Sequence, residues 1–363
     1  MRDPTSDHVP ELDGLRGIAA LAVLVFHAQG VFPGVGWVTV ASRWSRGGWL
    51  GVDLFFALSG YLITRNLLTL REGPRYYAPF YVRRVARIFP LYYLYLAGVF
   101  AVASRVGLPS HLYDLPSGDR WMFVAFVGNL PDAAGHWPGL LLAPLWSLAV
   151  EEQFYAVWPV IVRRRSIPTL LGVCVAAAVV ALGCRALADA YLADDAPYVL
   201  ALCRGDALLA GAAVALFARV HGGAQVAAWC RTYVAAAVTW LVLVAATPLG
   251  PRCVPGVYPS SVYTLVGYTV TSVACAVIVG SVAHGAPPVP WLRVRPLVFV
   301  GRVSYGVYVL HAAVGAGLYA LAPGAWRRGP LEVWALALVV ATVLVATVVH
   351  RVVERPVLAL TRR

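Results

Sequence analysis

The sequence has few charged residues and no lysine. Charged side chains make up 13% of its 363 residues, about half the share that is usual in soluble domains. All 29 of its basic residues are arginines, and the formal net charge is +12. Because 60% of the residues are hydrophobic, a single soluble core could not bury so much apolar surface. The composition excludes a soluble enzyme, a disordered chain and a basic nucleic-acid-binding domain, so nucleic acid is not expected as a partner.

Cysteine is also scarce, and its spacing matches neither a disulfide framework nor a metal site. Most of the six cysteines fall in apolar runs, where a thiol packs as a small hydrophobic group. They are Cys174, Cys184, Cys203, Cys230, Cys253 and Cys275. No metal ligand set is expected. Acidic residues such as Asp3 and Asp7 spoil the basic start of a secretory signal, so the first apolar run is expected to remain as a helix.

Apolar runs of about the length that spans a bilayer recur along the whole chain. They cover residues 12–30, 49–68, 88–104, 144–162, 167–187, 199–218, 227–247, 263–283, 297–321 and 331–352. The sequence therefore predicts an all-α polytopic membrane protein with about ten transmembrane helices, in a single domain over residues 1–363. The apolar segment 121–130 is too short to span a bilayer and is expected to be re-entrant or interfacial.

The arginines predict the orientation of the helices. Most of them fall near the N-terminus, near the C-terminus and in alternate loops, and cytoplasmic loops carry an excess of basic residues. Both termini are therefore expected to be cytoplasmic. The longest loop on the opposite side, 105–143, has no room for a folded domain, and no appended extracytoplasmic domain is expected.

Ionisable side chains within spanning segments are costly and mark candidate sites. Arg16 and His27 lie eleven residues apart in the first span, which puts them on one face of a helix and about 16 Å apart along its axis. This pair favours a functional site over a structural histidine. In the second span Asp53 could orient a histidine or pair with an arginine, and both readings stay open.

Two further groups of charges stand out. Glu151 and Glu152 are adjacent within the fourth span, so their side chains point about 100° apart and need different partners. Arg83, Arg84 and Arg87 lie where the third span begins, and guanidinium groups bind phosphate in a bidentate manner. They predict a phosphate site, although topology and contact with anionic lipids would explain them as well.

Polar residues in later spans are weaker candidates. Arg204 and Asp206 open the sixth span, and Ser304, Tyr308 and His311 lie in the ninth. Hydrogen bonds between helices would explain these residues as readily as a site.

Five segments in order resemble the acyltransferase-3 family of bacterial membrane O-acyltransferases. They are LDGLRG at 12–17 followed by His27, GVDLFFALSGY at 51–61, RRVAR at 83–87, WSLAVEEQFY at 146–155 and GRVSYGVYVLH at 301–311. The family pattern of a basic residue, ten intervening residues and a histidine is met by Arg16 and His27. Arg84 and Arg87 meet its arginine pair. Asp13, Ser147 and Tyr155, which lie in these segments, are added to the site candidates.

The resemblance implies transfer of an acyl group, commonly acetyl from acetyl-CoA, to a hydroxyl of a sugar-containing acceptor. The acceptor would be an envelope glycan or a glycosylated natural product, and the location the bacterial cytoplasmic (inner) membrane. Acyl-CoA would be a substrate, with no permanently bound cofactor. Arg83, Arg84 and Arg87 would bind its phosphates.

An alcohol is a poor nucleophile at neutral pH, so a general base is needed. His27 is the predicted base, with Asp53 or Glu152 to orient it and Arg16 at the phosphates or at the thioester oxyanion. An acyl-histidine intermediate is the competing mechanism. Paired charges within the membrane would also suit a transporter or acyl permease without covalent chemistry, although the chain shows no inverted repeat.

Overall fold

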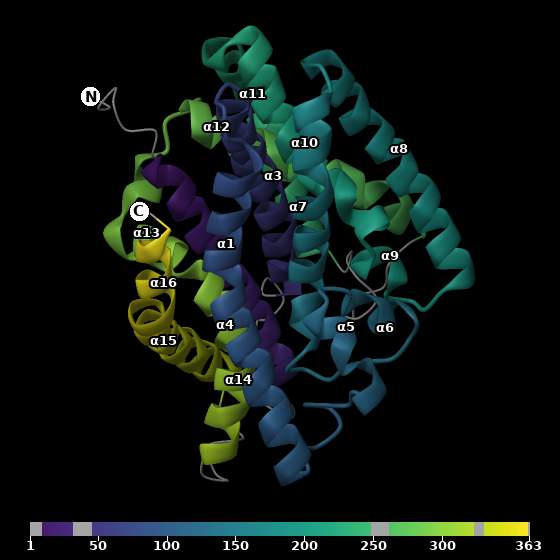
Figure 1. Ribbon diagram of the computed structural model, residues 1–363, viewed down its shortest axis with the longest axis vertical. Coiled ribbons are helices and arrows are strands. Elements are labelled where there is room, and N and C mark those ends of the chain that lie inside the picture. Colours follow the sequence, from purple (N-terminus) through teal and green to yellow (C-terminus); the bar gives the residue numbers. More distant parts are fainter. Residues whose placement is uncertain (1–8, 32–45, 248–260, 323–329, 362–363) are drawn as a thin grey trace.

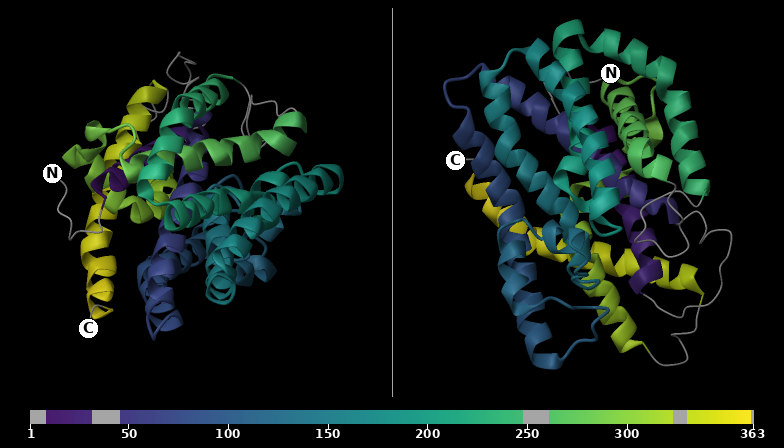
Figure 2. Two further views of the ribbon diagram at one scale, coloured as in Figure 1. Left: turned by 90° about the horizontal axis from the view of Figure 1, so that it is seen from above. Right: turned by 90° about the vertical axis from the view of Figure 1, so that its right-hand side faces the viewer.

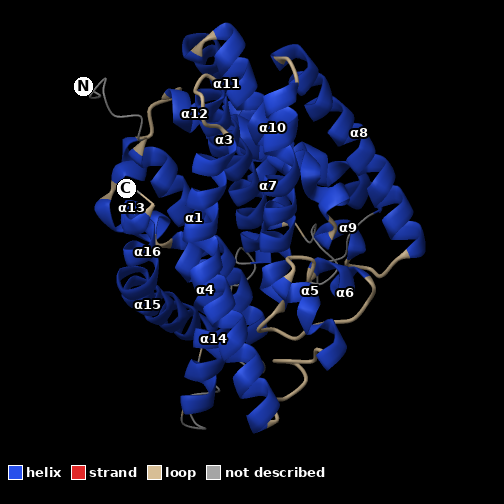
Figure 3. Ribbon diagram, in the orientation of Figure 1, coloured by secondary structure: helices blue, strands red, loops and turns tan. Residues whose placement is uncertain are grey.

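The chain folds into helices joined by loops and turns. The computed structural model describes residues 9–31, 46–247, 261–322 and 330–361, and no strand occurs among them (Figure 3). The prediction of an all-α protein is confirmed.

In the described ranges, ten helices have at least 17 residues. They are α1 (Pro10–Val31), α3 (Leu50–Arg71), α4 (Tyr77–Val106), α7 (Trp146–Arg164), α8 (Ile167–Tyr191), α10 (Ala201–His221), α11 (Gly223–Ala246), α12 (Tyr268–His284), α14 (Ser304–Leu321) and α15 (Leu331–Val349). Each corresponds to one of the apolar runs in the sequence.

Shorter elements connect or extend the long helices. The α-helical ones are α5 (Arg120–Val124), α6 (Asn129–Ala133), α9 (Ala196–Val199), α13 (Arg295–Arg302) and α16 (Arg355–Leu360). The 3₁₀ turns are η1 (Arg46–Trp49), η2 (Ser117–Asp119), η3 (Ala143–Leu145) and η5 (Pro290–Arg293). Two π-helical turns, η4 (Tyr263–Gly267) and η7 (His350–Glu354), lead into α12 and follow α15. With five residues each, α5 and α6 are far too short to span, as expected for the segment 121–130.

The protein is a multi-pass membrane protein. Within the described residues, eight helices are long and apolar enough to cross a bilayer, and they contain α3, α4, α8, α10, α11, α12, α14 and α15. The remaining two long helices, α1 and α7, have 22 and 19 residues, or about 33 and 28 Å. These two carry Arg16, His27 and the adjacent glutamates.

α3 lies at the centre of the bundle and α8 at its edge. The span that contains α3 is 83% buried and the one that contains α8 only 17%. α3 packs against α10, α1, α12 and α7. The buried residues of α8 (Leu170, Cys174, Ala181, Arg185 and Ala188) form one stripe at helical spacing, as expected for a helix at the edge of the bundle (Figure 1).

The central helix α3 comes very close to α10. A Cβ atom at Gly60 would overlap the carbonyl of Leu208, and one at Gly211 would overlap the carbonyl of Ala57. Small residues allow such close backbone approach between helices in a membrane. The contact therefore fixes the position of the α3 residues that face the site described below.

α15 crosses the other helices obliquely and packs against α14 and α1 (Figure 2, yellow in the right-hand view). At the opposite side of the molecule, α6 is bound to α7 and α9 by amide hydrogen bonds. Asn129 donates to the carbonyl of Val199 at 3.1 Å, and Gln153 of α7 donates to the side-chain oxygen of Asn129 at 3.0 Å. The loop 105–143 is thereby held against the bundle.

The five described cysteines are free thiols. Cys253 lies outside the described residues. Among the described residues, no group of three histidines, cysteines or carboxylates is placed to hold a metal ion.

Candidate active site

A cavity of about 120 Å³ lies between α1, α3, α4, α7 and the start of α14. Its apolar wall comes mainly from α3, with Val52, Phe55, Phe56, Leu62 and Ile63. Its polar lining consists of Arg16, Ser59, Arg84, Arg87, Ser147, Glu151, Tyr155, Ser304, Tyr305 and Tyr308. Eight of the residues singled out from the sequence therefore come together from four helices.

Three arginines of this lining form no ion pair within the described residues, although Glu151 lies within electrostatic range of Arg16 and Arg84. Arg16 of α1 lies within electrostatic range of Arg84 and Arg87 of α4. In the described part of the chain, none of the three forms an ion pair or donates a hydrogen bond to a protein atom. The guanidinium of Arg84 lies 6.0 Å from the ring of Tyr155, and its Nε is buried without a partner. Clustered guanidiniums with free donors are suited to bind an anion such as phosphate.

Arg83 does not belong to this cluster. Its side chain is exposed, and its Nε donates to the carbonyl of Pro79, one turn earlier in α4, at 2.9 Å. Asp13 also lies outside the cavity lining, 3.5 Å from the exposed guanidinium of Arg302. Of the three arginines expected at a phosphate site, two line the cavity, and Arg16 joins them.

The adjacent glutamates of α7 have different surroundings. Glu151 lines the cavity and accepts a hydrogen bond from Tyr155 at 3.0 Å, and Tyr155 is also bonded to Ser59 of α3. Glu152 is not part of the lining; its neighbours include Arg84 and Tyr92, and its Oε1 is buried without a hydrogen-bond partner. The 100° step between successive residues of a helix accounts for this separation.

Tyr308 closes the cavity on the side of α14. Its hydroxyl donates to the carbonyl of Pro144 at 2.8 Å and is 2.6 Å from the hydroxyl of Ser147. Its ring centroid is 5.8 Å from that of His311. Tyr308 therefore stands between the cavity and the histidines beyond it.

His27 does not line the cavity but forms a pair with His311. Their ring centroids are 4.7 Å apart, with 45° between the ring planes. His27 Nδ1 donates to the carbonyl of Val23 at 3.0 Å. Neither Asp53 nor Glu152 is bonded to His27 in the described structure, so the proposed carboxylate orienter of this imidazole is absent there.

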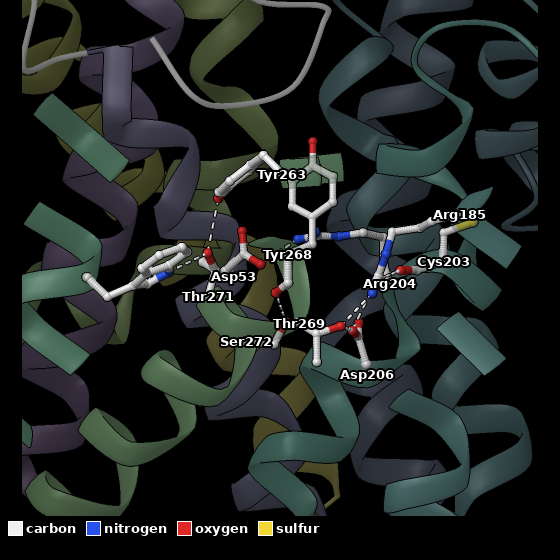
Figure 4. A network of polar contacts seen from close by, with 11 residues as sticks. Asp53, Arg185, Cys203, Arg204, Asp206, Tyr263, Tyr268, Thr269, Thr271 and Ser272 are labelled. Carbon is white, nitrogen blue, oxygen red and sulfur yellow. Dashed lines mark hydrogen bonds and ion pairs between the residues drawn. The ribbon is translucent and has the colours of Figure 1, made fainter. Parts of the chain in front are cut away.

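Asp53 belongs to a separate buried network (Figure 4). Its Oδ1 is 2.5 Å from Nη2 of Arg204, and both side chains are fully buried. Arg185 of α8 is 3.0 Å from Asp206 and donates to the carbonyl of Cys203 at 2.6 Å. Of the two readings of Asp53 that the sequence left open, pairing with an arginine is the one found.

Aromatic and hydroxyl groups complete this network. The guanidinium of Arg204 lies 4.5 Å from the ring centroid of Tyr268 and 5.1 Å from that of Tyr198. Thr269 donates to Asp206 at 2.7 Å. Such contacts satisfy and shield charges that would be costly in a membrane. The network ties together α3, α8, α10 and α12.

Arg185 and Ser59 are among the residues of these clusters that sequence reasoning missed. Arg185 could have been identified from the sequence, because an arginine within an apolar run requires a partner. Ser59 could not, because a serine in a membrane helix commonly bonds to its own backbone and has no distinguishing sequence pattern. Only the contact between α3 and α7 reveals its role.

The chain is similar to known acyltransferases. The family model described as an acyltransferase domain matches residues 9–351. The chain is 28% identical to the peptidoglycan O-acetyltransferase OatA of Listeria monocytogenes and 28% identical to the putative peptidoglycan O-acetyltransferase YrhL of Bacillus subtilis. Each match covers 96% of this chain, and 56% and 55% of the respective relative. A putative O-acetyltransferase of Staphylococcus aureus is 33% identical over 42% of this chain and 24% of its own length.

The chain thus spans about half the length of the curated relatives that it matches most fully. No solved structure matches it. The family model, which covers nearly the whole chain, favours an enzyme over a permease without covalent chemistry. The chain belongs to the acyltransferase-3 family.

Proposed function

We propose that the protein is a membrane O-acetyltransferase that moves an acetyl group from cytoplasmic acetyl-CoA to a hydroxyl of a glycan acceptor. The observation that carries this proposal is the cavity whose lining includes three guanidiniums that form no ion pair within the described residues. The similarity to proteins named peptidoglycan O-acetyltransferases supports the acetyl group and the glycan. A glycosylated natural product is the alternative acceptor.

The arginine cluster suits the phosphates of the donor. CoA carries a pyrophosphate and a ribose phosphate, and Arg16, Arg84 and Arg87 offer donors from two helices. Arg16 is about 16 Å along α1 from His27, which supports a role at the phosphates rather than at the thioester oxyanion. The long flexible arm of CoA would extend from these arginines along the apolar wall of α3 towards Tyr308.

His27 is the proposed general base. Because Nδ1 donates to the Val23 carbonyl, a neutral ring carries its lone pair on Nε2. In direct transfer, the acceptor oxygen attacks the thioester carbon and its proton moves to His27 Nε2. The C–S bond then breaks, and the thiolate takes the proton from His27. In the competing mechanism Nε2 attacks the thioester carbon and the C–S bond breaks, which leaves an acyl group on His27 and the thiolate of CoA. The acceptor oxygen then attacks the acyl carbon, the bond to Nε2 breaks, and the hydroxyl proton passes to the thiolate.

The distribution of arginines supports the proposed orientation. Arg16, Arg84 and Arg87 lie at the ends of spans that the positive-inside rule assigns to the cytoplasm. With this end of the cavity inside, a cytoplasmic donor reaches the arginines directly. The proposed location is the bacterial cytoplasmic membrane, with both termini cytoplasmic.

The test measures thiol release from acetyl-CoA by the purified full chain in lipid nanodiscs, with and without a soluble peptidoglycan fragment. The intact protein should release thiol, and His27→Ala should lower kcat by about 10²- to 10⁴-fold, the usual contribution of a general base. Mass spectrometry of the protein without acceptor separates the mechanisms, since only the relay leaves an acetyl group on His27.

His221→Ala is the matched control, because this histidine is exposed at the end of α10 and stacks on Phe217. It should keep normal turnover. Wild-type turnover by folded His27→Ala would overturn the assignment of the base. Flux of an unmodified solute without any thiol release would overturn the enzymatic function.

A further inference from the structure

The partner of His27 is a second, fully buried imidazole. His311 of α14 is 0% exposed, and its ring centroid is 4.7 Å from that of His27 on α1. The two rings therefore meet where these helices pack together. Neither ring is ion-paired with any residue in the described ranges.

Each ring is fixed by its own helix. His27 Nδ1 donates to Val23, four residues earlier, at 3.0 Å, and His311 Nδ1 donates to Tyr308, three residues earlier, at 2.6 Å. A neutral imidazole with its proton on Nδ1 is a hydrogen-bond acceptor at Nε2. The structure thus brings together two imidazole rings, and their Nε2 atoms, both acceptors, could bond to each other only with an added proton.

The acceptor on His311 is unused. Its Nε2 is buried and has no hydrogen-bond partner among the described residues. Most buried polar atoms in proteins are hydrogen-bonded, so an unpaired one calls for an explanation. A proton on Nε2 of the neighbouring imidazole would supply the missing donor, and the reaction proposed above delivers a proton to His27.

We propose that His311 is a positioning residue that stabilises protonated His27 by accepting a hydrogen bond from its Nε2–H; this inference rests on the proposed function. The acceptor O–H bond breaks as the O–C bond forms, and the proton moves to His27. It leaves His27 for the thiolate when the C–S bond has broken. His311 accepts a hydrogen bond during this interval and undergoes no net change.

Few other ionisable groups face the pair. Tyr308 of α14 contacts His311, but its hydroxyl is engaged by Pro144 and Ser147. α15 contributes Glu332, which is exposed in its first turn. α3 contributes the ring of Phe55 against Tyr308, and its Asp53 is held by Arg204. His311 is therefore the group placed to stabilise a charge on His27.

The experiment compares His311→Phe, which keeps a ring but removes the acceptor, with His311→Gln, which keeps an acceptor oxygen. Both are assayed as full-length protein in nanodiscs by thiol release from acetyl-CoA between pH 5 and 9. His311→Phe should lower kcat by about 10- to 100-fold and leave KM for acetyl-CoA within about twofold. The acid limb of its kcat/KM profile should move to lower pH, because protonated His27 has lost its acceptor. His311→Gln should restore part of the rate and of the limb.

Thr342→Val is the control, since Thr342 is fully buried on α15 and its hydroxyl is also unpaired. It should leave the rate and the pH profile unchanged. A folded His311→Phe with a normal rate and a normal acid limb would overturn the inference, and His311→Leu repeats the test if the phenylalanine variant does not fold. Normal turnover by His27→Ala would instead overturn the proposed base, whatever His311 does.

Discussion

At the scale of single residues, the buried aspartates of the polar network are ion-paired, whereas the arginines that line the cavity are not. Asp53 and Asp206 have arginine partners. Arg16, Arg84 and Arg87 form no ion pair within the described residues, and they line a cavity. Since an unpaired charge at membrane depth is costly, such a cluster is retained where it binds an anionic ligand.

Arg83 and Arg84 provide a direct comparison, because they are neighbours on α4 with different surroundings. Arg84 lines the cavity, whereas Arg83 is exposed and bonded to Pro79. Arg84→Ala should raise KM for acetyl-CoA about tenfold or more, since a hydrogen bond to a charged group contributes about 1.5–3 kcal/mol. Arg83→Ala should change KM less than about twofold. Initial rates of thiol release across a donor series measure both, and equal effects of the two variants would contradict the cavity as the donor site.

At the scale of elements, α3 links the buried charge network to the site. Asp53 fixes one turn of this helix against Arg204 of α10. Ser59, less than two turns later, is bonded to Tyr155 at the cavity. We therefore expect the network to affect the site through the position of α3, because Asp53 is bonded to Arg204 and not to His27.

Removing one charge of the Asp53–Arg204 pair should destabilise the fold more than removing both. Asp53→Asn leaves Arg204 buried without its counter-ion, which costs about 3–5 kcal/mol for such pairs. The double variant Asp53→Leu with Arg204→Met removes both charges and should lose less stability. Thermal unfolding in detergent measures the difference. A double variant that melts below Asp53→Asn would show that the charges themselves hold the helices together.

At the scale of the whole molecule, the sequence predicts where a residue lies along a spanning helix better than it predicts which residues of other helices it contacts. The apolar runs located ten long helices because a spanning segment needs about 20 apolar residues whatever surrounds it. The spacing of Arg16 and His27 also follows from helix geometry alone. The sequence could not show that His27 meets His311, or that Asp53 meets Arg204, because these contacts depend on which helices pack side by side. The π-helical turns η4 and η7 were likewise beyond a pattern of hydrophobic residues.

The stability of the whole molecule should depend on pH through Asp132. This residue lies in α6, outside the spanning segments, and its burial, followed by the nearby charge of Asp195, raises its pKa to about 7. An unfolded aspartate has a pKa of about 3.9. Between these values the folded state holds a proton that the unfolded state has lost, so stability falls as pH rises from about 4 to about 7 and then levels off. The slope in this window is about 1.4 kcal/mol per pH unit for one proton.

Asp132→Asn keeps the shape of the side chain and removes its titration. This variant should closely match the natural protein near pH 4, where the carboxyl is protonated in the folded state and about half protonated in the unfolded state, and melt at a higher temperature at pH 8, when both are followed by thermal unfolding in detergent. Asp114→Asn, at an exposed position of the same loop, should leave the pH dependence as it is. A difference between the Asp132 variant and the natural protein that stays the same at pH 4 and pH 8 would show that the charge of this carboxyl does not control the stability. α6 is bonded to α7 through Asn129 and Gln153, and α7 carries Glu151 and Ser147 of the cavity. Because of this connection, ionisation of Asp132 at alkaline pH should also weaken the packing of α7 at the cavity.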